Sequence, residues 1–196
     1  MDRADASGLV IVKLGGAHAL SPDLADELDA LAGWRRPMVL VPGGGPFADA
    51  VRQAQPVMGL DDRAAHHMAL LAMEQFGLAI CSLDDRYVPA SRTDGFAQAL
   101  SAGQIPVWLP SQMALADPSI EMSWRVTSDS LAVWLAGQLG ACDVVLVKRI
   151  AEPVAESDIG VLVGTGVVDE ALPEMLQRYP VRLSIIGPLG QGIAVA

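Results

Sequence analysis

The sequence is poor in cysteine and in charge. Its two cysteines, Cys81 and Cys142, stand far apart, and neither has a CxxC neighbour or a nearby histidine. This count excludes a disulfide framework, and the spacing disfavours a zinc or redox motif. Both lie beside apolar residues, so we expect buried, inert thiols. Charged residues make up only 18% of the 196 residues and hydrophobic residues 52%, a balance that is untypical of intrinsic disorder.

Basic residues and long apolar runs are also scarce. Thirteen Lys and Arg against 23 Asp and Glu give a net charge of −10, which disfavours nucleic acid and anionic membranes as partners. The longest weakly polar stretch, 131–142, is far shorter than the roughly 20 residues that span a bilayer. The acidic start lacks the features of a signal peptide. We therefore expect a cytoplasmic protein with a single domain over residues 1–196.

Short apolar runs alternate with helical patterns along the chain. Strands are predicted at 9–12, 38–41, 105–109, 143–147 and 181–186, and helices at 22–31, 61–76, 128–139 and 169–178 and from Pro46. Gly77 is expected to end the 61–76 helix, and Pro106 to place its strand in an irregular or edge position. The segment 151–166 has the weakest pattern and reads as a loop or a trimmed subdomain. This alternation predicts an α/β fold whose parallel sheet is covered on both faces.

Glycines follow two of the predicted strands, where ligands bind in open α/β sheets. The first strand runs into Lys13-Leu14-Gly15-Gly16, and the second into Pro42-Gly43-Gly44-Gly45. Glycine lets backbone N–H groups approach an anion closely, and the start of the following helix adds a favourable dipole. A lysine beside such a turn supplies the positive charge that a transferring phosphoryl group needs. The two turns therefore predict a phosphate-binding site rather than simple strand-to-helix connections.

Other polar residues stand at predicted strand ends and helix starts. Thr127 and Ser128 begin the 128–139 helix, where one of them is expected to cap it. Asp129 follows in the first turn and is a candidate partner for Lys13. Lys148 ends a strand and is a candidate second phosphate contact, although a solvated lysine fits equally well. Of the histidines, His18 and one of His66 and His67 are candidates to reach a ligand.

The second glycine turn also matches a weaker dinucleotide-binding pattern. Gly43, Gly45 and Ala48 satisfy GxGxxA, which would suit a dinucleotide-dependent oxidoreductase. That fingerprint places an acidic residue at the end of the next strand. Here Asp61 and Asp62 open a predicted helix, and 49–60 contains poor strand material. This alternative is therefore disfavoured.

Taken in order, these motifs resemble those of the amino acid kinase superfamily. The resemblance rests on Val12 to Gly16, Pro42 to Ala48 and Thr127 to Ala132, and it covers about residues 8–148 well. Further motifs are similar to the small kinases that phosphorylate an aminomethylfuran-methyl phosphate in methanofuran biosynthesis. These motifs are Leu109-Pro110-Ser111, Ser123-Trp124 and Val168-Asp169-Glu170. The resemblance implies a three-layer αβα sandwich around a mostly parallel sheet.

The resemblance also implies a role for each matching residue. Lys13 would bridge the donor and acceptor phosphates, and Asp129 would orient it. The implied phosphate and nucleotide contacts are Gly15, Gly16 and Ser128. The implied contacts to a small phosphorylated acceptor are Gly43, Gly44, Gly45 and Thr127. ATP would be the donor, with Mg²⁺ travelling on its phosphates and no dedicated protein metal site, and a homodimer is expected, with the 61–76 helix as a candidate interface.

The sequence departs from the family pattern after about residue 148. The Thr-Asp-Val-Asp-Gly type segment that helps hold the nucleotide is replaced by Lys148-Arg149-Ile150-Ala151-Glu152. A later Gly-Gly-Met segment with its lysine is missing, so Lys148 is a candidate catalytic replacement. Because the nucleotide side is short, a non-catalytic nucleotide or anion binder with the same fold remains the alternative to an active kinase.

Overall fold

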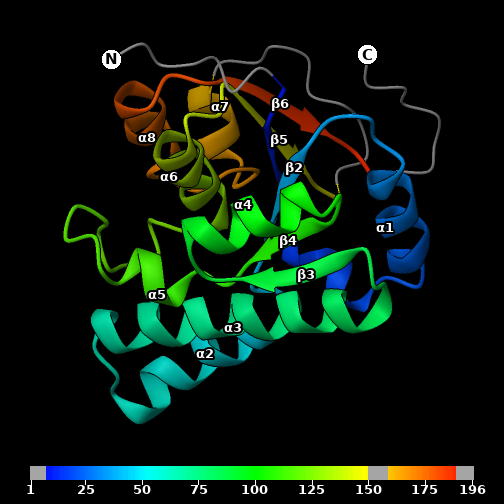
Figure 1. The fold of residues 1–196 in the computed structure, drawn as a ribbon. Coiled ribbons are helices and arrows are strands. Elements are labelled where there is room, and N and C mark those ends of the chain that lie inside the picture. Colours follow the sequence, from blue (N-terminus) through cyan, green and yellow to red (C-terminus); the bar gives the residue numbers. More distant parts are fainter. Residues whose placement is uncertain (1–7, 150–158, 189–196) are drawn as a thin grey trace.

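A computed structural model of the protein describes residues 8–149 and 159–188. Within them, six parallel strands form one sheet in the order β3-β4-β2-β1-β5-β6 (Figure 1). The strands are β1 (Val10–Leu14), β2 (Met38–Pro42), β3 (Tyr87–Ala90), β4 (Ile105–Trp108), β5 (Asp143–Val147) and β6 (Arg182–Ile186). The helices are η1 (Gly16–Leu20, a 3₁₀-helix), α1 (Leu24–Ala32), α2 (Gly45–Met58), α3 (Asp62–Leu83), α4 (Thr93–Ser101), α5 (Ser111–Ala114), α6 (Ser128–Leu139), α7 (Ile159–Gly164) and α8 (Leu172–Arg178).

Alternate residues of the central strands pack into opposite layers. Ile11 belongs to a buried cluster that contains α6 and α8, whereas Val10 and Val12 belong to a second cluster that contains α1. Successive side chains of a strand point to opposite faces of the sheet, so this division shows helices on both faces. The predicted three-layer αβα arrangement is confirmed. The same alternation places Lys13, two residues after Ile11, on the face that α6 covers.

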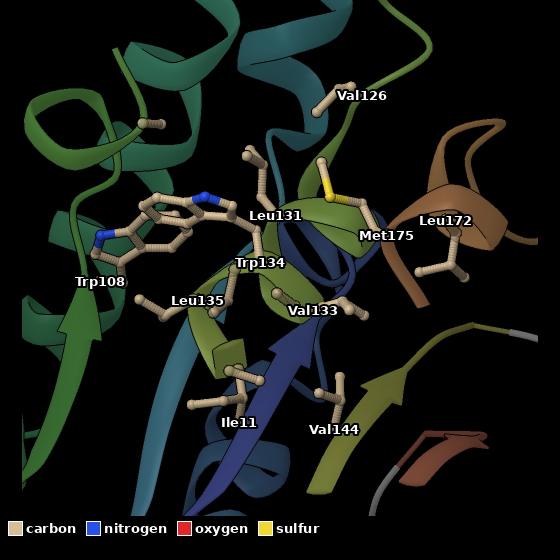
Figure 2. Packing of buried hydrophobic residues seen from close by; sticks show 14 of the residues in the cluster. Ile11, Trp108, Val126, Leu131, Val133, Trp134, Leu135, Val144, Leu172 and Met175 are labelled. Atoms are coloured by element: carbon tan, nitrogen blue, oxygen red, sulfur yellow. The ribbon is translucent and has the colours of Figure 1, made fainter. Parts of the chain in front are cut away.

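Helix α6 is embedded in the molecule. Every residue from Ser128 to Ala136 is buried, including the polar Asp129 and Ser130. Figure 2 shows Leu131 and Leu135 of this helix above Ile11, with the rings of Trp108 and Trp134 beside them. The two indole rings stack with centroids 5.7 Å apart and planes 20° apart. The start of α6, where the polar residues lie, is therefore held by packing along the whole helix.

The structure differs from prediction in the region of α3 and β4. Helix α3 continues through Gly77 to Leu83. A Cβ on Gly77 would lie 3.2 Å from the side chains of Val107 and Leu109, so this glycine allows close packing on β4 and does not end the helix. Strand β4 is not at an edge, because β3, which was not predicted, pairs outside it. Helix α4 was also missed, and α1 begins two residues later than predicted.

Three smaller expectations have mixed outcomes. Cys81 is half-buried, and burial raises its pKa to about 11, but Cys142 is exposed, so the expectation of two buried thiols is wrong for Cys142. Of the weakly patterned segment 151–166, residues 151–158 lie outside the described part, and most of the remainder forms α7. In the described part of the chain, no helix has both the length and the apolar character to cross a membrane.

Candidate active site

Both lysines of the chain meet at one carboxylate. The sequence contains two lysines, Lys13 and Lys148. Lys13 Nζ lies 2.9 Å from Asp129 Oδ1, and Lys148 Nζ donates to Asp129 Oδ2 at 2.5 Å. Lys13 lies on β1 and Lys148 directly follows its neighbour β5, at positions that face α6. The structure thus brings together the three residues that were expected to be catalytic, and the scarcity of lysine is a signal in the sequence that points to them.

The charges in this cluster are mutually dependent because they are buried. Burial would raise the pKa of the Asp129 carboxyl, but Lys13 and Lys148 outweigh it and hold that pKa below its ordinary value. Burial and repulsion from Lys13 lower the pKa of Lys148, against the attraction of Asp129. Two ammonium groups share one carboxylate, so the cluster carries an excess positive charge. Water screens this charge poorly, because Lys13 is only 5% exposed. Such a cluster favours an anionic ligand.

The two glycine turns cross so closely that they form one cradle. A Cβ on Gly16 would lie 2.1 Å from the nitrogen of Gly45, and a Cβ on Gly43 would lie 2.3 Å from the nitrogen of Gly16. Gly45 has a φ of 51°, a conformation that favours glycine. The crossing therefore requires glycine at these positions, and it joins the end of β1 to the start of α2.

Some backbone N–H groups of this cradle donate hydrogen bonds to the protein, and others have no protein acceptor and are called open donors below. Gly15 N–H donates to Val147 O at 2.9 Å, and Gly43 N–H donates to Leu14 O at 2.8 Å. This differs from the expectation that Gly15 N–H contacts a phosphoryl group, because that donor extends the hydrogen bonding of the sheet. In the part of the chain that the structure describes, Gly16 and Gly44 N–H have no protein acceptor. Because Gly44 precedes α2, the positive end of that helix dipole reinforces the open donors.

A pocket of about 170 Å³ adjoins the cradle. Gly44, Gly45, Thr127 and Ser128 line it on one side, as expected for a site between the second glycine turn and α6. Further lining residues come from α2, α3 and the segment before α6, and include Asp49, Arg52, His66 and Trp124. The pocket therefore combines backbone donors with a cation, an aromatic wall and a carboxylate.

Sequence reasoning missed Arg52 as a site residue and named Trp124 only as part of a motif. The Arg52 guanidinium carbon lies 4.3 Å from the centroid of the Trp124 ring, and Trp124 Nε1 donates to Gln55 Oε1 at 2.6 Å. The signal available in the sequence is spacing. Gly45, Ala48, Asp49 and Arg52 all line the pocket and fall on one face of a helix that begins at the glycine turn.

The histidines take separate places. His66 is buried and lines the pocket, whereas His67 is exposed, so one of this pair reaches the site as expected. His18 was a candidate to contact a ligand. It is fully buried beside the first glycine turn instead, where its Nδ1 pairs with Glu27. Gly15 packs directly on its ring, because a Cβ there would lie 3.4 Å from His18 Cδ2.

The start of α6 is capped by a residue from a distant segment. Neither Thr127 nor Ser128 caps the helix with its own side chain. Asp169 Oδ2 accepts from Thr127 N at 2.9 Å, from Thr127 Oγ1 at 2.8 Å and from Ser130 N at 3.0 Å, and Asp169 Oδ1 accepts from Ser130 Oγ. The expected local cap is therefore wrong, and Asp169 is a further residue of this region.

The carboxylates in the described segments are dispersed. No group of three or more His, Cys, Asp or Glu side chains there is placed to hold a metal ion. Asp129 is already bound by both lysines.

Comparisons with known proteins identify the family and the fold. The sequence profile of the amino acid kinase family matches residues 8–152. A [5-(aminomethyl)furan-3-yl]methyl phosphate kinase from Methanocaldococcus jannaschii is 26% identical over 193 residues, which cover 90% of this chain and 86% of that protein. UMP kinase from Bacillus anthracis has a TM-score of 0.66 at 16% identity, over 94% of this chain and 89% of that one. Aspartate kinase from Synechocystis has a TM-score of 0.60 at 16% identity, over 93% of this chain and 39% of that one.

The fold, the cradle with its lysines and these relatives define a small-molecule kinase. The chain belongs to the amino acid kinase family. The oxidoreductase alternative is wrong, because α2 is followed directly by helix α3, whereas a dinucleotide site needs a strand there that ends in an acidic residue. Asp61, the candidate ribose ligand, instead caps α3 by accepting from Ala64 N at 2.7 Å.

Proposed function

We propose that the protein transfers the γ-phosphoryl group of ATP to a small phosphorylated acceptor, and that this acceptor is an aminomethylfuran-methyl phosphate, which becomes a diphosphate. The observation that carries the proposal is the convergence of Lys13 and Lys148 on Asp129 beside the glycine cradle. The choice of acceptor follows the M. jannaschii relative, whose name specifies that substrate. The product class would be a precursor in methanofuran-type cofactor synthesis.

In this proposal, catalysis consists of positioning and charge neutralisation. An oxygen of the acceptor phosphate attacks the γ-phosphorus in line. The bond to the bridging oxygen breaks, and ADP leaves with the electron pair. Lys13 contacts both phosphates, while Lys148 supplies a second positive charge and Asp129 fixes both. Gly16 and Gly44 N–H, which have no acceptor among the described residues, bind phosphoryl oxygens.

The acceptor lies in the pocket beside Gly44 and Gly45 in this scheme. Thr127 and Ser128 line this pocket, and in this scheme Thr127 contacts the acceptor and Ser128 the phosphates. The wall made by Arg52 and Trp124 offers a cation for an acceptor phosphate and an indole face for a flat ring. Asp49 lies 3.2 Å from Arg52 and supplies a carboxylate that suits an aminomethyl group. A furan that carries both a phosphate and an amine matches these three features.

Mg²⁺ bound to the ATP phosphates would neutralise their charge. Residues 1–196 are proposed to act as one domain, in the cytoplasm where ATP is available. The family resemblance and the exposed apolar side chains of α3 favour a homodimer.

Phosphorus-31 NMR with Mg-ATP and synthetic [5-(aminomethyl)furan-3-yl]methyl phosphate tests the proposal. ADP and a new diphosphate signal are expected together, and neither is expected with Lys13→Ala. If ATP binds, as followed by tryptophan fluorescence, but neither substrate is consumed, the acceptor is wrong or the protein is a non-catalytic binder. A panel of other small phosphates then separates these two readings.

A further inference from the structure

Residues 167–169, which are distant in sequence from the glycine turns, contact two parts of the candidate site. Val167 O accepts a hydrogen bond from Lys148 Nζ, the same ammonium that binds Asp129. Two residues later, Asp169 makes the four-bond cap on the first turn of α6. Asp129 lies in that turn. The segment therefore fixes one of the lysines and the helix turn that carries their shared carboxylate.

Val168 packs in the core and the N–H groups of Val167 and Val168 bond to Leu162 O, but the Asp169 side chain makes its hydrogen bonds to the start of α6. A helix was predicted over 169–178, but α8 begins only at Leu172. Asp169 is thus outside α8, and its carboxylate is directed at a helix about 40 residues earlier in the chain. A cap made by Thr127 itself would satisfy one or two N–H groups. Here the Thr127 hydroxyl donates to Asp169, and both Asp169 oxygens are occupied.

We propose that Asp169 is a positioning residue for phosphoryl transfer, which acts by fixing Asp129 and by adding negative charge near Lys148. The proposal rests on the proposed kinase function. Among the described residues, Asp169 makes no hydrogen bond or ion pair with either lysine. Its effect on them is therefore exerted through α6 and through the electrostatic attraction between its carboxylate and Lys148. Its removal is expected to loosen the Asp129 turn and to leave Lys148 with less compensating charge.

The charge balance around Lys148 supports an electrostatic component. Burial and Lys13, on β1, lower the pKa of Lys148, whereas Asp129, on α6, and Asp169 raise it. Lys13, Asp129 and Asp169 are the charged groups that act on Lys148 from the elements packed around it. Neutralising Asp169 therefore removes one of two favourable charges. This is expected to lower the Lys148 midpoint.

The lysine content makes this measurable without an activity assay. The sequence contains only two lysines, so a protein labelled with ¹³C-lysine gives two side-chain signals, which Lys148→Arg assigns. Wild type and Asp169→Asn are titrated side by side. The Lys148 midpoint is expected to move to lower pH in the variant. With Mg-ATP and the furan phosphate, Asp169→Asn is expected to lower kcat about 10- to 100-fold with little change in the KM for the acceptor. In a plot of kcat against pH, the decrease on the alkaline side is expected to move to lower pH together with the Lys148 midpoint.

Two control variants separate positioning from folding. Asp117→Asn removes the charge of another carboxylate that contacts α6, which accepts from Ser119 N at 2.9 Å and from Trp134 Nε1 at 2.8 Å. It is expected to leave both lysine titrations unchanged. Ser130→Ala keeps the Asp169 charge but removes one donor to it, so it is expected to lower kcat without moving the Lys148 midpoint. If Asp169→Asn is too unstable to assay, Asp169→Glu keeps the negative charge at this position and is expected to retain part of the wild-type kcat.

The outcomes are distinct. If Asp169→Asn lowers the melting temperature but leaves the Lys148 midpoint and kcat unchanged, Asp169 is only a helix cap and the inference is wrong. If wild type does not turn over the furan phosphate, the proposed function fails, and the lysine titration still decides whether Asp169 acts on Lys148.

Discussion

At the scale of single residues, the candidate site depends on where very few charges are placed. In this acidic chain, the two lysines lie on one face of the sheet, Lys13 buried and Lys148 partly buried, and one aspartate binds both. Lys13 could be predicted because it precedes a glycine pair. Its link to Lys148 could not, because it depends on β1 and β5 being neighbours and on α6 covering them. Asp169 was recognisable as part of a motif, but nothing local indicated its partner.

Lys13→Met tests the central charge. Methionine keeps much of the side-chain length but removes the ammonium, and Asp129 keeps Lys148 as its partner. We expect kcat to fall by about 10²- to 10³-fold, the usual effect of losing one preorganised donor to the transition state. Steady-state kinetics with a coupled ADP assay measures it. Arg63→Met, which removes a positive charge from an exposed position of α3, is the control; equal losses in both variants would contradict the role of Lys13.

At the scale of elements, strands and helices with clear periodicity were predictable and close packing was not. Helix α6 and strand β5 have the predicted bounds. Gly77 was misread because a glycine that ends a helix and one that allows a strand to approach look alike in sequence. Strand β3 was missed because Tyr87-Val88-Pro89-Ala90 is short and contains proline, which an edge strand tolerates.

The crossing of the two glycine turns gives a prediction about elements. Gly16→Ala puts a methyl group 2.1 Å from the nitrogen of Gly45, and backbone atoms there cannot move aside without shifting β1 or α2. We expect a loss of about 2 kcal/mol in the free energy of unfolding, within the range for overpacked sites, together with loss of transfer activity. Urea denaturation measures the stability. Gly164→Ala, where a Cβ would meet nothing within 4 Å, should be neutral.

At the scale of the whole molecule, pH acts through buried histidines. Burial lowers the pKa of His18 in spite of Glu27, and burial lowers that of His66 in spite of its hydrogen bond to Ser123 O. The unfolded state, with a pKa of about 6.5 for histidine, then binds protons at a higher pH than the folded state. Stability from both groups is complete above that value and decreases as pH falls from it toward the lowered folded pKa values.

Urea denaturation at pH 7.5 and pH 5.5 tests this expectation. The free energy of unfolding should be lower at pH 5.5, and the decrease should be smaller in His66→Gln. His67→Gln, the exposed neighbour, should behave like wild type. An equal decrease in wild type and His66→Gln would show that His66 does not contribute.

The outer surface of α3 gives the second prediction at this scale. Leu71 and Leu78 are 41% and 52% exposed and lie on one face of the helix, which Figure 1 shows packed beside α2 on the outside of the molecule. At the adjoining end of α2, Val57 is 86% exposed. We expect this face to join two copies of the chain, so wild type should sediment as a dimer at micromolar concentration.

Leu71→Lys with Leu78→Lys should give a monomer, because four charges would then meet in a dimer interface. Val161→Lys, at an exposed apolar position on α7, is the matched control and should leave the dimer intact. A monomeric wild type would contradict the interface.

The confinement of both lysines to one buried cluster has a practical consequence for chemical labelling. Side-chain amines elsewhere are absent from the sequence, so a reagent that acylates amines has, besides these two lysines, only the α-amino group of the chain to react with. Its reaction with these side chains reports directly on the cluster, and ligands that fill the cradle should protect them. The extent of acylation, read by intact mass, thus becomes a footprint of occupancy that needs neither a chromophore nor turnover.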